Sequence, residues 1–327
     1  MKKNIAIVWG GYTSESVVSE KSMKGIFSFL DKALYAVYPV KIERAAWTAE
    51  ADGANCPIDK NDFSFVLNGA KIKFDFACIT IHGSPGEDGR LQGYFDMLGL
   101  PYSSCGMMAS ALTMNKYICN KYLRNFGVKT ADSALFTEGV AYDDVKNVAE
   151  KLKFPLFVKP NLGGSSFATT KVKTLDRLQE AIDAAFGEAE EVIVESFLQG
   201  VEVTCGCYKT GAKITVFPLT EVVTANEFFD YDAKYNGQVD EITPARISAE
   251  QTETVQKLTE KIYGLIGAKG IIRADYIIKD GEPFLLEVNT TPGMTATSFI
   301  PQQIKAAGLN ITEVFNEIID NELKRHI

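Results

Sequence analysis

Two short and almost wholly apolar runs constrain the fold of this chain more than any other feature. The first, NIAIVWGG (4–11), ends in two glycines and leads into a helical pattern that continues to about Leu30, with Ser14 as the predicted cap. The second, FDFACITIHG (74–83), leads through a loop rich in glycine and acidic residues into a helix from about Gly89. Buried strands that alternate with helices predict an α/β unit with an open parallel sheet.

Ligands of such sheets bind at the carboxyl ends of the strands. Gly10-Gly11 and His82-Gly83 stand at these ends, so substrate is expected next to them. Neither pair belongs to a GxGxxG pattern, and GxxxxGK[ST] is absent, so the sequence does not support a dinucleotide or P-loop site.

Shorter elements follow from about Thr130. Strands are predicted at EVIVESFL (191–198), VEVTCGCY (201–208), GIIRADYII (270–278) and FLLEVN (284–289), with a helix from about Ala249 to Leu265 and two helices at the end. Gly163 to Ser166 suit either a phosphate-covering loop or an ordinary glycine turn. The long connection VTANEFFDYDAKYNGQVDEITPAR (223–246) indicates a functional lid or disorder.

Composition excludes several classes of protein. The net charge of -8, from 42 acidic and 34 basic residues, argues against a general nucleic-acid binder. Six cysteines without CxxC spacing, only two histidines and a short first apolar run argue against a zinc site and a signal peptide. Cys205 and Cys207 are predicted to pack on one strand face. No segment is apolar for long enough to span a bilayer, and a reduced cytoplasmic protein is expected.

The stretch LLEVNTTPG (285–293) combines a buried strand with two oxygen-bearing side chains. Glu287 and Asn289 are two residues apart on this strand, so they face the same way, as do Arg273 and Asp275 on the preceding strand. Carboxylate and amide oxygens are the ligands that Mg²⁺ prefers when it bridges nucleotide phosphates. The alternatives are a strand end whose polar residues face water and, for Arg273, a salt bridge to one of the two acids.

Several segments in this order resemble the D-alanine–D-alanine ligases of the ATP-grasp superfamily. The most specific are HGSPGEDGRLQG (82–93), MASALTMNK (108–116), YDAKY (231–235) and EVNTTPGMTATS (287–298), and the resemblance runs essentially end to end. It implies an α/β ATP-grasp fold with an N-terminal substrate-binding domain (1–106), a central domain (107–196) and a C-terminal catalytic domain (197–327). It also implies a homodimer that joins two D-alanines through a D-alanyl phosphate for peptidoglycan synthesis, while ATP becomes ADP.

The resemblance assigns the ATP and metal residues. Asp275, Glu287 and Asn289 are expected to hold two Mg²⁺ ions that share Glu287, with Mn²⁺ as an alternative ion. The candidate phosphate-binding lysines are Lys116, Lys159 and Lys234, because a compact ammonium suits phosphate oxygens. Glu195 and Glu202 match positions that contact adenine and ribose hydroxyls, and main-chain groups of Ser196, Phe197 and Leu198 would complete the adenine pocket.

The resemblance also assigns the amino-acid half of the reaction. Glu15 matches the residue that binds the first D-alanine ammonium, with Ser165 and Tyr235 as its hydrogen-bond partners, and His82 is expected near the first carboxylate. Arg273 and the backbone N–H of Gly293 would form the oxyanion site. Ser298 and the Phe299 N–H would hold the second carboxylate. The base for the second amine is not identified, and the Ser165 and Tyr235 pair is a candidate relay.

This chain departs from the family pattern at several positions. Ser16-Val17 replaces a basic and an acidic residue after Glu15, Leu162 replaces an arginine, and Phe167-Ala168 replaces Val-Gly. These changes alter the charge around Glu15 and the glycine loop, and they motivate a non-catalytic ATP-binding protein as one alternative. The other is a D-alanine–D-lactate ligase, against which Tyr235 argues, because a phenylalanine there accompanies hydroxy-acid use in the family. A biotin-dependent carboxylase fits less well.

Overall fold

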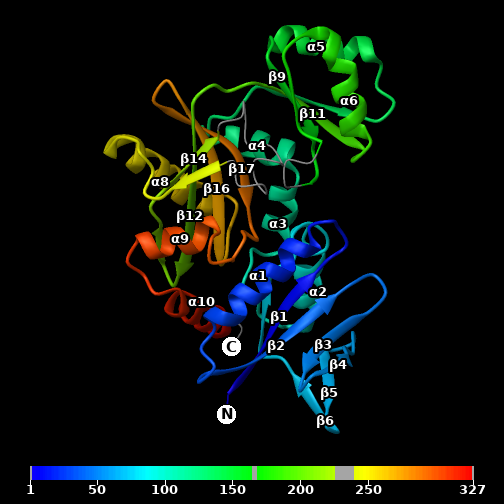
Figure 1. Cartoon of the computed structure of the whole chain (residues 1–327), viewed down its shortest axis with the longest axis vertical. Coiled ribbons are helices and arrows are strands. Elements are labelled where there is room, and N and C mark those ends of the chain that lie inside the picture. Colours follow the sequence, from blue (N-terminus) through cyan, green and yellow to red (C-terminus); the bar gives the residue numbers. More distant parts are fainter. Residues whose placement is uncertain (1, 164–167, 225–238, 326–327) are drawn as a thin grey trace.

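The N-terminal unit is a five-stranded sheet built around the first apolar run (Figure 1). The computed structural model describes residues 2–163, 168–224 and 239–325. The elements of this unit are β1 (Lys3–Gly10), α1 (Ser16–Phe29), β2 (Tyr35–Ile42), β3 (Trp47–Ala51), β4 (Ala54–Pro57), β5 (Ser64–Leu67), β6 (Ala70–Lys73), β7 (Phe76–Ile79) and α2 (Arg90–Leu98). The order is β4-β3-β2-β1-β7, and β1 pairs in parallel with both β2 and β7, which confirms the predicted parallel core.

The start of α1 differs from the prediction. The cap is Glu15 rather than Ser14, because the Glu15 carbonyl accepts hydrogen bonds from the N–H groups of Val18 and Ser19 at 2.9 and 3.0 Å. The end at Phe29 lies one residue before the predicted Leu30, and α2 starts directly after Gly89, as expected. The helix therefore presents Glu15 itself at its N-terminus.

A four-stranded antiparallel sheet forms the central unit, at the far end of the molecule from the N-terminal sheet (Figure 1). Its order is β10-β9-β11-β8, and α5 and α6 pack on it through a shared apolar core. Two helices, α3 and α4, precede it. The bounds are α3 (Met107–Met114), α4 (Lys116–Arg124), β8 (Ser133–Thr137), α5 (Tyr142–Leu152), β9 (Leu156–Pro160), β10 (Thr170–Val172), the short helix η1 (Leu175–Arg177), α6 (Leu178–Phe186) and β11 (Glu191–Ser196).

The C-terminal unit is a six-stranded sheet in the order β15-β14-β12-β16-β17, with β13 also paired to β12. Its elements are β12 (Val201–Thr210), β13 (Lys213–Val216), β14 (Thr220–Thr224), β15 (Val239–Ile242), α8 (Ala249–Leu265), β16 (Ile271–Lys279), β17 (Glu282–Asn289), α9 (Phe299–Ala306) and α10 (Ile311–Arg325). The predicted helix 249–265 is confirmed and starts at a capping box formed by Ser248 and Gln251. Cys205 and Cys207 are fully buried in this sheet, as expected.

Part of the long connection from Val223 to Arg246 is a strand. Its last described residues include β15, which pairs antiparallel with β14 and so extends the sheet. Residues 225–238, which include the YDAKY motif, and residues 164–167 of the glycine loop lie outside the described residues. No helix in the described ranges is long and apolar enough to cross a membrane.

One close contact fixes the N-terminal unit against the C-terminal unit. Gly25 of α1 lies so near the loop after β17 that a β-carbon on it would be 2.0 Å from the Met294 carbonyl oxygen. Ser22 accepts a hydrogen bond from the Met294 N–H at 3.3 Å. Met23 and Ile26 of the same helix share a core with Phe315 and Ile318 of α10, and Figure 1 shows these two helices close together. The helix that Glu15 caps is thus packed on the segment that carries Gly293.

Candidate active site

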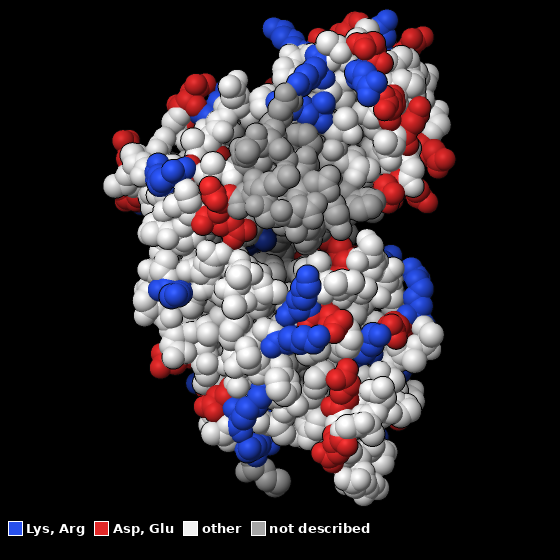
Figure 2. All heavy atoms as spheres, viewed as in Figure 1, with Lys and Arg blue, Asp and Glu red and all other residues white. Residues whose placement is uncertain are grey.

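A cavity of about 1540 Å³ is lined by residues of the N-terminal, central and C-terminal units. Its walls include Glu15 from the cap of α1, Lys116 from α4, Lys159 from β9, Glu202 from β12 and Arg273 from β16. Figure 2 shows the molecule hollowed between the N-terminal unit and the remainder, with charges of both signs around it. A cavity of this size, lined by cations and carboxylates, is large enough for a nucleotide together with small substrates.

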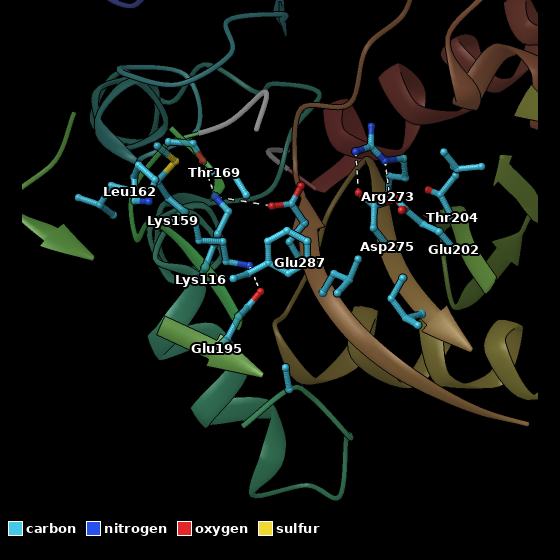
Figure 3. Close-up of a pocket in the computed structure, with 18 of the residues that line it drawn as sticks. Lys116, Lys159, Leu162, Thr169, Glu195, Glu202, Thr204, Arg273, Asp275 and Glu287 are labelled. Carbon is cyan, nitrogen blue, oxygen red and sulfur yellow. Dashed lines mark hydrogen bonds and ion pairs between the residues drawn. The ribbon is translucent and has the colours of Figure 1, made fainter. Parts of the chain in front are cut away.

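Two lysines and two glutamates face one another across the part of the cavity next to the central unit. Lys159 Nζ lies 2.6 Å from Glu195 Oε1, and both side chains are nearly buried, at 14% and 9% exposed. Lys116 Nζ donates to the Gly163 carbonyl and lies 3.6 Å from Glu287 Oε2. Figure 3 shows these side chains pointing toward one another from α4, β9, β11 and β17. Partly desolvated ammonium groups held in this way can bind phosphate oxygens strongly.

The wall beside Glu195 is apolar and aromatic. Ser196, Phe197 and Leu198, the predicted adenine-pocket segment, line the cavity, and Glu202 lines it from the next strand. The Phe157 and Phe197 rings lie 5.8 Å apart, and Lys171 Nζ lies 3.9 Å from the Phe197 ring centroid. Such a wall can stack a planar base. Phe157 was not among the predicted site residues, although it stands two residues before Lys159 and thus on the same face of β9.

The two strands of the predicted metal site are neighbours in the structure. In the β16–β17 ladder Arg273 is opposite Asn289 and Asp275 is opposite Glu287. Arg273 donates to both carboxylate oxygens of Asp275, at 2.8 and 2.7 Å, so the alternative salt bridge is present. Although burial opposes the charged form, the Asp275 and Glu287 carboxylates raise the pKa of the Arg273 guanidinium above its ordinary value. The arginine is therefore a permanent cation at this position.

The side chains of Asp275, Glu287 and Asn289 on the paired strands β16 and β17 are of the kinds that bind a hard cation. The Asn289 amide nitrogen donates to Asp275 at 3.0 Å and to Glu287 at 3.5 Å, so two carboxylates and one amide converge there. Within the described ranges no group of three or more histidine, cysteine or acidic side chains is placed to hold a metal. Because Mg²⁺ usually takes only one or two protein carboxylates and completes its shell with water and phosphate, the set of Asp275, Glu287 and Asn289 fits it.

The loop after β7 forms the wall around Glu15. A β-carbon on Gly83 would meet Thr13 at 3.0 Å and Glu15 Oε2 at 3.5 Å, so glycine, with φ of +69°, permits this close approach. The His82 carbonyl accepts a hydrogen bond from Thr13 at 3.3 Å. His82 therefore lies close to the start of α1, although the residues found to line the cavity include Thr13, Glu15 and Ser84 from this region and not His82.

Glu87 is a partly buried acid in this loop and was not among the predicted site residues. Its carboxylate accepts the Gly83 N–H at 2.7 Å, and its own N–H donates to the Gly83 carbonyl at 2.8 Å. Burial raises the pKa of the Glu87 carboxyl to about 7, with Glu15 and Glu287 acting in the same direction. The only sequence signal was its place in the GEDG segment, which pointed to a loop rather than to this residue.

The segment predicted to serve the second substrate forms a compact turn before α9. Ser298 caps this helix, its hydroxyl accepts the Thr295 N–H at 3.1 Å, and it lies 3.1 Å from the position of a β-carbon on Gly293. The Phe299 ring lines the cavity, with its centroid 5.2 Å from the Arg273 guanidinium carbon. The structure thus brings Phe299 beside Arg273 and Ser298 beside Gly293, and of these four residues Arg273 and Phe299 line the cavity.

Two further residues of the cavity wall were not predicted. Thr204 is buried and lines the cavity, and the signal for it was its spacing of two from Glu202 on the same strand. Glu221 also lines the cavity and accepts two hydrogen bonds from the Arg246 guanidinium, each at 2.9 Å. Glu221 and Arg246 are 25 positions apart in the sequence, and no local pattern predicts that they interact.

Three residues of the predicted site, Ser165, Lys234 and Tyr235, lie outside the described residues. Two positions that depart from the family pattern, Val17 and Leu162, line the cavity with apolar side chains that are 60% and 45% exposed. The cavity rim near Glu15 and near the glycine loop is therefore more apolar in this chain than the usual pattern implies.

Comparison with known proteins agrees with this architecture. The family model described as D-ala D-ala ligase N-terminus matches residues 4–105, and the one described as D-ala D-ala ligase C-terminus matches residues 122–320. The D-alanine–D-alanine ligase of Parabacteroides distasonis is 64% identical over 326 residues, which cover 99% of this chain and 98% of that protein.

Solved structures are similar over the same length. The VanG D-Ala:D-Ser ligase of Enterococcus faecalis superposes with a TM-score of 0.87 at 30% identity and covers 100% of both chains. The D-alanine–D-alanine ligase of Bacillus anthracis in complex with ATP superposes with a TM-score of 0.79 at 30% identity, over 99% of this chain and 98% of that one. The protein has the ATP-grasp fold, and the chain belongs to the D-alanine–D-alanine ligase family.

Proposed function

We propose that this protein joins two D-alanine molecules into D-alanyl-D-alanine for peptidoglycan precursor synthesis, while ATP is converted to ADP and phosphate. The observation that carries the proposal is the shared cavity. It places the cationic Lys116, Lys159 and Arg273 and the acidic Asp275 and Glu287 together with Glu15 from the N-terminal unit. A ligase that forms an acyl phosphate needs all of these groups around one space, because phosphoryl transfer and attack on the carbonyl take place in turn at the same carboxyl group.

The nucleotide would bind between the central and C-terminal sheets. Lys116, Lys159 and Lys234 would hold its phosphates, and Glu195, Glu202 and the Ser196 to Leu198 segment would hold its adenosine. Asp275, Glu287 and Asn289 would hold two Mg²⁺ ions, for which Mn²⁺ could substitute. When bound, these ions would screen the charge of the phosphate oxygens.

The amino acids would bind on the N-terminal side. Glu15, supported by Ser165 and Tyr235, would accept the ammonium of the first D-alanine, and His82 would lie near its carboxylate. Arg273 and the Gly293 N–H would stabilise the oxyanion formed when the second amine attacks the D-alanyl phosphate, with phosphate as the leaving group. Ser298 and the Phe299 N–H would fix the second carboxylate.

The organisation of the whole molecule forms part of the proposal. We infer domains at 1–106, 107–196 and 197–327, a homodimeric assembly and a cytoplasmic location. Size-exclusion chromatography with light scattering tests the dimer, and a monomer at micromolar concentration would contradict it.

Product analysis tests the activity directly. The protein is incubated with ATP, Mg²⁺ and D-alanine, alone or with equimolar D-lactate or D-serine, and products are identified by mass spectrometry while phosphate release is measured. We expect D-alanyl-D-alanine as the main product at neutral pH. A depsipeptide or a D-alanyl-D-serine product in excess would overturn the choice of second substrate. Tight ATP binding without D-alanine-dependent ADP release would instead indicate a non-catalytic protein.

A further inference from the structure

A single buried glutamine joins helix α9 to strand β12. The Gln303 side chain is fully buried, at 0% exposed, and both of its amide atoms are used. Its Oε1 accepts the Gly206 N–H at 2.9 Å, and its Nε2 donates to the Thr204 carbonyl at 3.0 Å and to the Thr220 hydroxyl at 3.1 Å. A buried amide is stable only when it is paired in this way, so the side chain has one defined position.

Gln303 lies where the hydrogen-bond ladder along one edge of β12 is interrupted. One edge of β12 pairs with β14 through Glu202 to Thr204 and with β13 through Cys207 to Thr210, and neither ladder includes Gly206. Phe217 N–H donates to the Gly206 carbonyl at 2.9 Å, which leaves the Gly206 N–H for the glutamine. At this point the Gln303 side chain makes the hydrogen bonds with the β12 backbone that a neighbouring strand would otherwise make.

Gly206 allows the helix to approach this closely. A β-carbon at Gly206 would be 2.3 Å from Ile300 Cδ1 and 2.8 Å from Gln303 Oε1. On its other side β12 pairs with β16, where Gly206 is directly opposite Arg273. The helix is therefore fixed to the backbone position next to the arginine of the proposed oxyanion site.

The first turn of α9 contributes to the cavity. The helix starts directly after Ser298, and Phe299 lines the cavity beside Arg273. Thr204, whose carbonyl accepts from Gln303, lines the cavity from β12. One side chain consequently connects the proposed site of the second D-alanine with the strand that also carries Glu202.

We propose that Gln303 is a positioning residue that holds Ser298 and Phe299 in register with Arg273, and so determines how well the second D-alanine is bound. This inference rests on the proposed function. It predicts a larger effect on the second amino acid than on the nucleotide. Lys116, Lys159, Glu195 and Glu287 lie on α4, β9, β11 and β17, to which Gln303 makes no hydrogen bond among the described residues, whereas Glu202 shares β12 with two of its partners.

The test is Gln303→Met, which keeps the length of the side chain and removes all three hydrogen bonds. We expect the KM for the second D-alanine to rise about tenfold, because small displacements of a binding group weaken the reacting complex strongly, while the KM for ATP changes less than about twofold. Gln303→Glu keeps an acceptor for the Gly206 N–H but cannot donate to the Thr204 carbonyl when it is ionised. It should shift the same constant in the same direction, and it serves as the second variant if Gln303→Met does not fold.

Gln256→Met is the matched control. Gln256 on α8 donates to the Phe217 carbonyl at 3.0 Å, so the same substitution removes a hydrogen bond to the connection between β13 and β14 of the same sheet. The control should lower the melting temperature without changing the KM for the second D-alanine. Equal shifts in both D-alanine and ATP constants in the Gln303 variants, or no shift, would show a merely structural role. If the wild-type protein forms no D-alanyl dipeptide, the proposed function itself fails and this assignment fails with it.

Discussion

Lys116, at the first position of α4, and Glu287, near the end of β17, form an ion pair with 3.6 Å between Nζ and Oε2. One residue is a proposed phosphate ligand and the other a proposed metal ligand, and 171 positions separate them in the chain. Glu287 also accepts a hydrogen bond from the Asn289 amide nitrogen at 3.5 Å, so it contacts both a proposed phosphate-binding lysine and another proposed metal ligand. The carboxylate at this position connects the two halves of the nucleotide site.

Replacing Glu287 by alanine is expected to reduce kcat by at least about 100-fold, because the proposed shared metal ligand is lost. Steady-state phosphate release measures the effect. Glu282→Ala is the control, since Glu282 lies on the same strand and forms an exposed ion pair with Lys129, with side chains 55% and 52% exposed. Near-normal turnover of Glu287→Ala would refute the metal assignment.

Lys159→Ala is expected to raise the KM for ATP about tenfold, because a charged donor to phosphate is lost and Glu195 remains almost buried without its 2.6 Å partner. The KM is measured with D-alanine saturating. Lys257→Ala provides the comparison, since Lys257 is 72% exposed and pairs with Glu253 one helical turn away. An unchanged KM for ATP in the Lys159 variant would remove this lysine from the phosphate site.

Gly25→Ala is expected to destabilise the protein by about 1–3 kcal/mol, because the added methyl group would stand 2.0 Å from the Met294 carbonyl oxygen and α1 would have to move. Urea unfolding measures the loss. Gly264→Ala is the matched helical control, because Gly264 lies in α8 with no atom within 4 Å of the added carbon. It should stabilise the protein by roughly 0.5–1 kcal/mol. Equal effects of the two substitutions would mean that α1 does not need this contact.

The raised pKa of the Glu87 carboxyl predicts that the stability of the protein depends on pH. Burial raises the pKa of its carboxyl from 4.5 to about 7, with further contributions from Glu15 and Glu287 that the Gly83 N–H and Lys116 oppose. The folded state therefore binds the proton more tightly than the unfolded state. This contribution to stability is complete below about pH 4.5 and is lost as the pH rises through about 7.

The Glu87→Gln variant should consequently lose less thermal stability than the wild type between about pH 5 and about pH 7.5, because glutamine does not ionise. Melting temperatures across this range provide the measurement. Glu253→Gln is the comparison, since exposed Glu253 has its pKa lowered, first by its hydrogen bond to Lys257, and stays ionised throughout the range. Parallel curves for Glu87→Gln and the wild type would contradict a titrating Glu87.

The order of elements was predictable because local patterns determine it. The apolar runs of β1 and β7, the helix from Ala249 to Leu265 and the alternation in β16 and β17 depend only on neighbouring residues. The prediction of Ser14 as the cap of α1 was wrong by one residue, since the cap depends on where the first helical hydrogen bond forms. Arg273, Asp275, Glu287 and Asn289 could be grouped in advance, because the spacing of two on adjacent strands places them on one face.

The sequence by itself determined the family, the parallel core of the N-terminal unit and the chemical identity of the site residues, because each is encoded in a contiguous motif. Only the tertiary structure decided which groups meet: Lys116 with Glu287, Lys159 with Glu195, Gln303 with the interrupted edge of β12, and Gly25 with the loop after β17. The physical reason is that hydrogen bonds and ion pairs act over a few ångströms in space. The packing of the three units brings these partners together, and no periodic pattern in the sequence predicts which distant residues will be close in space.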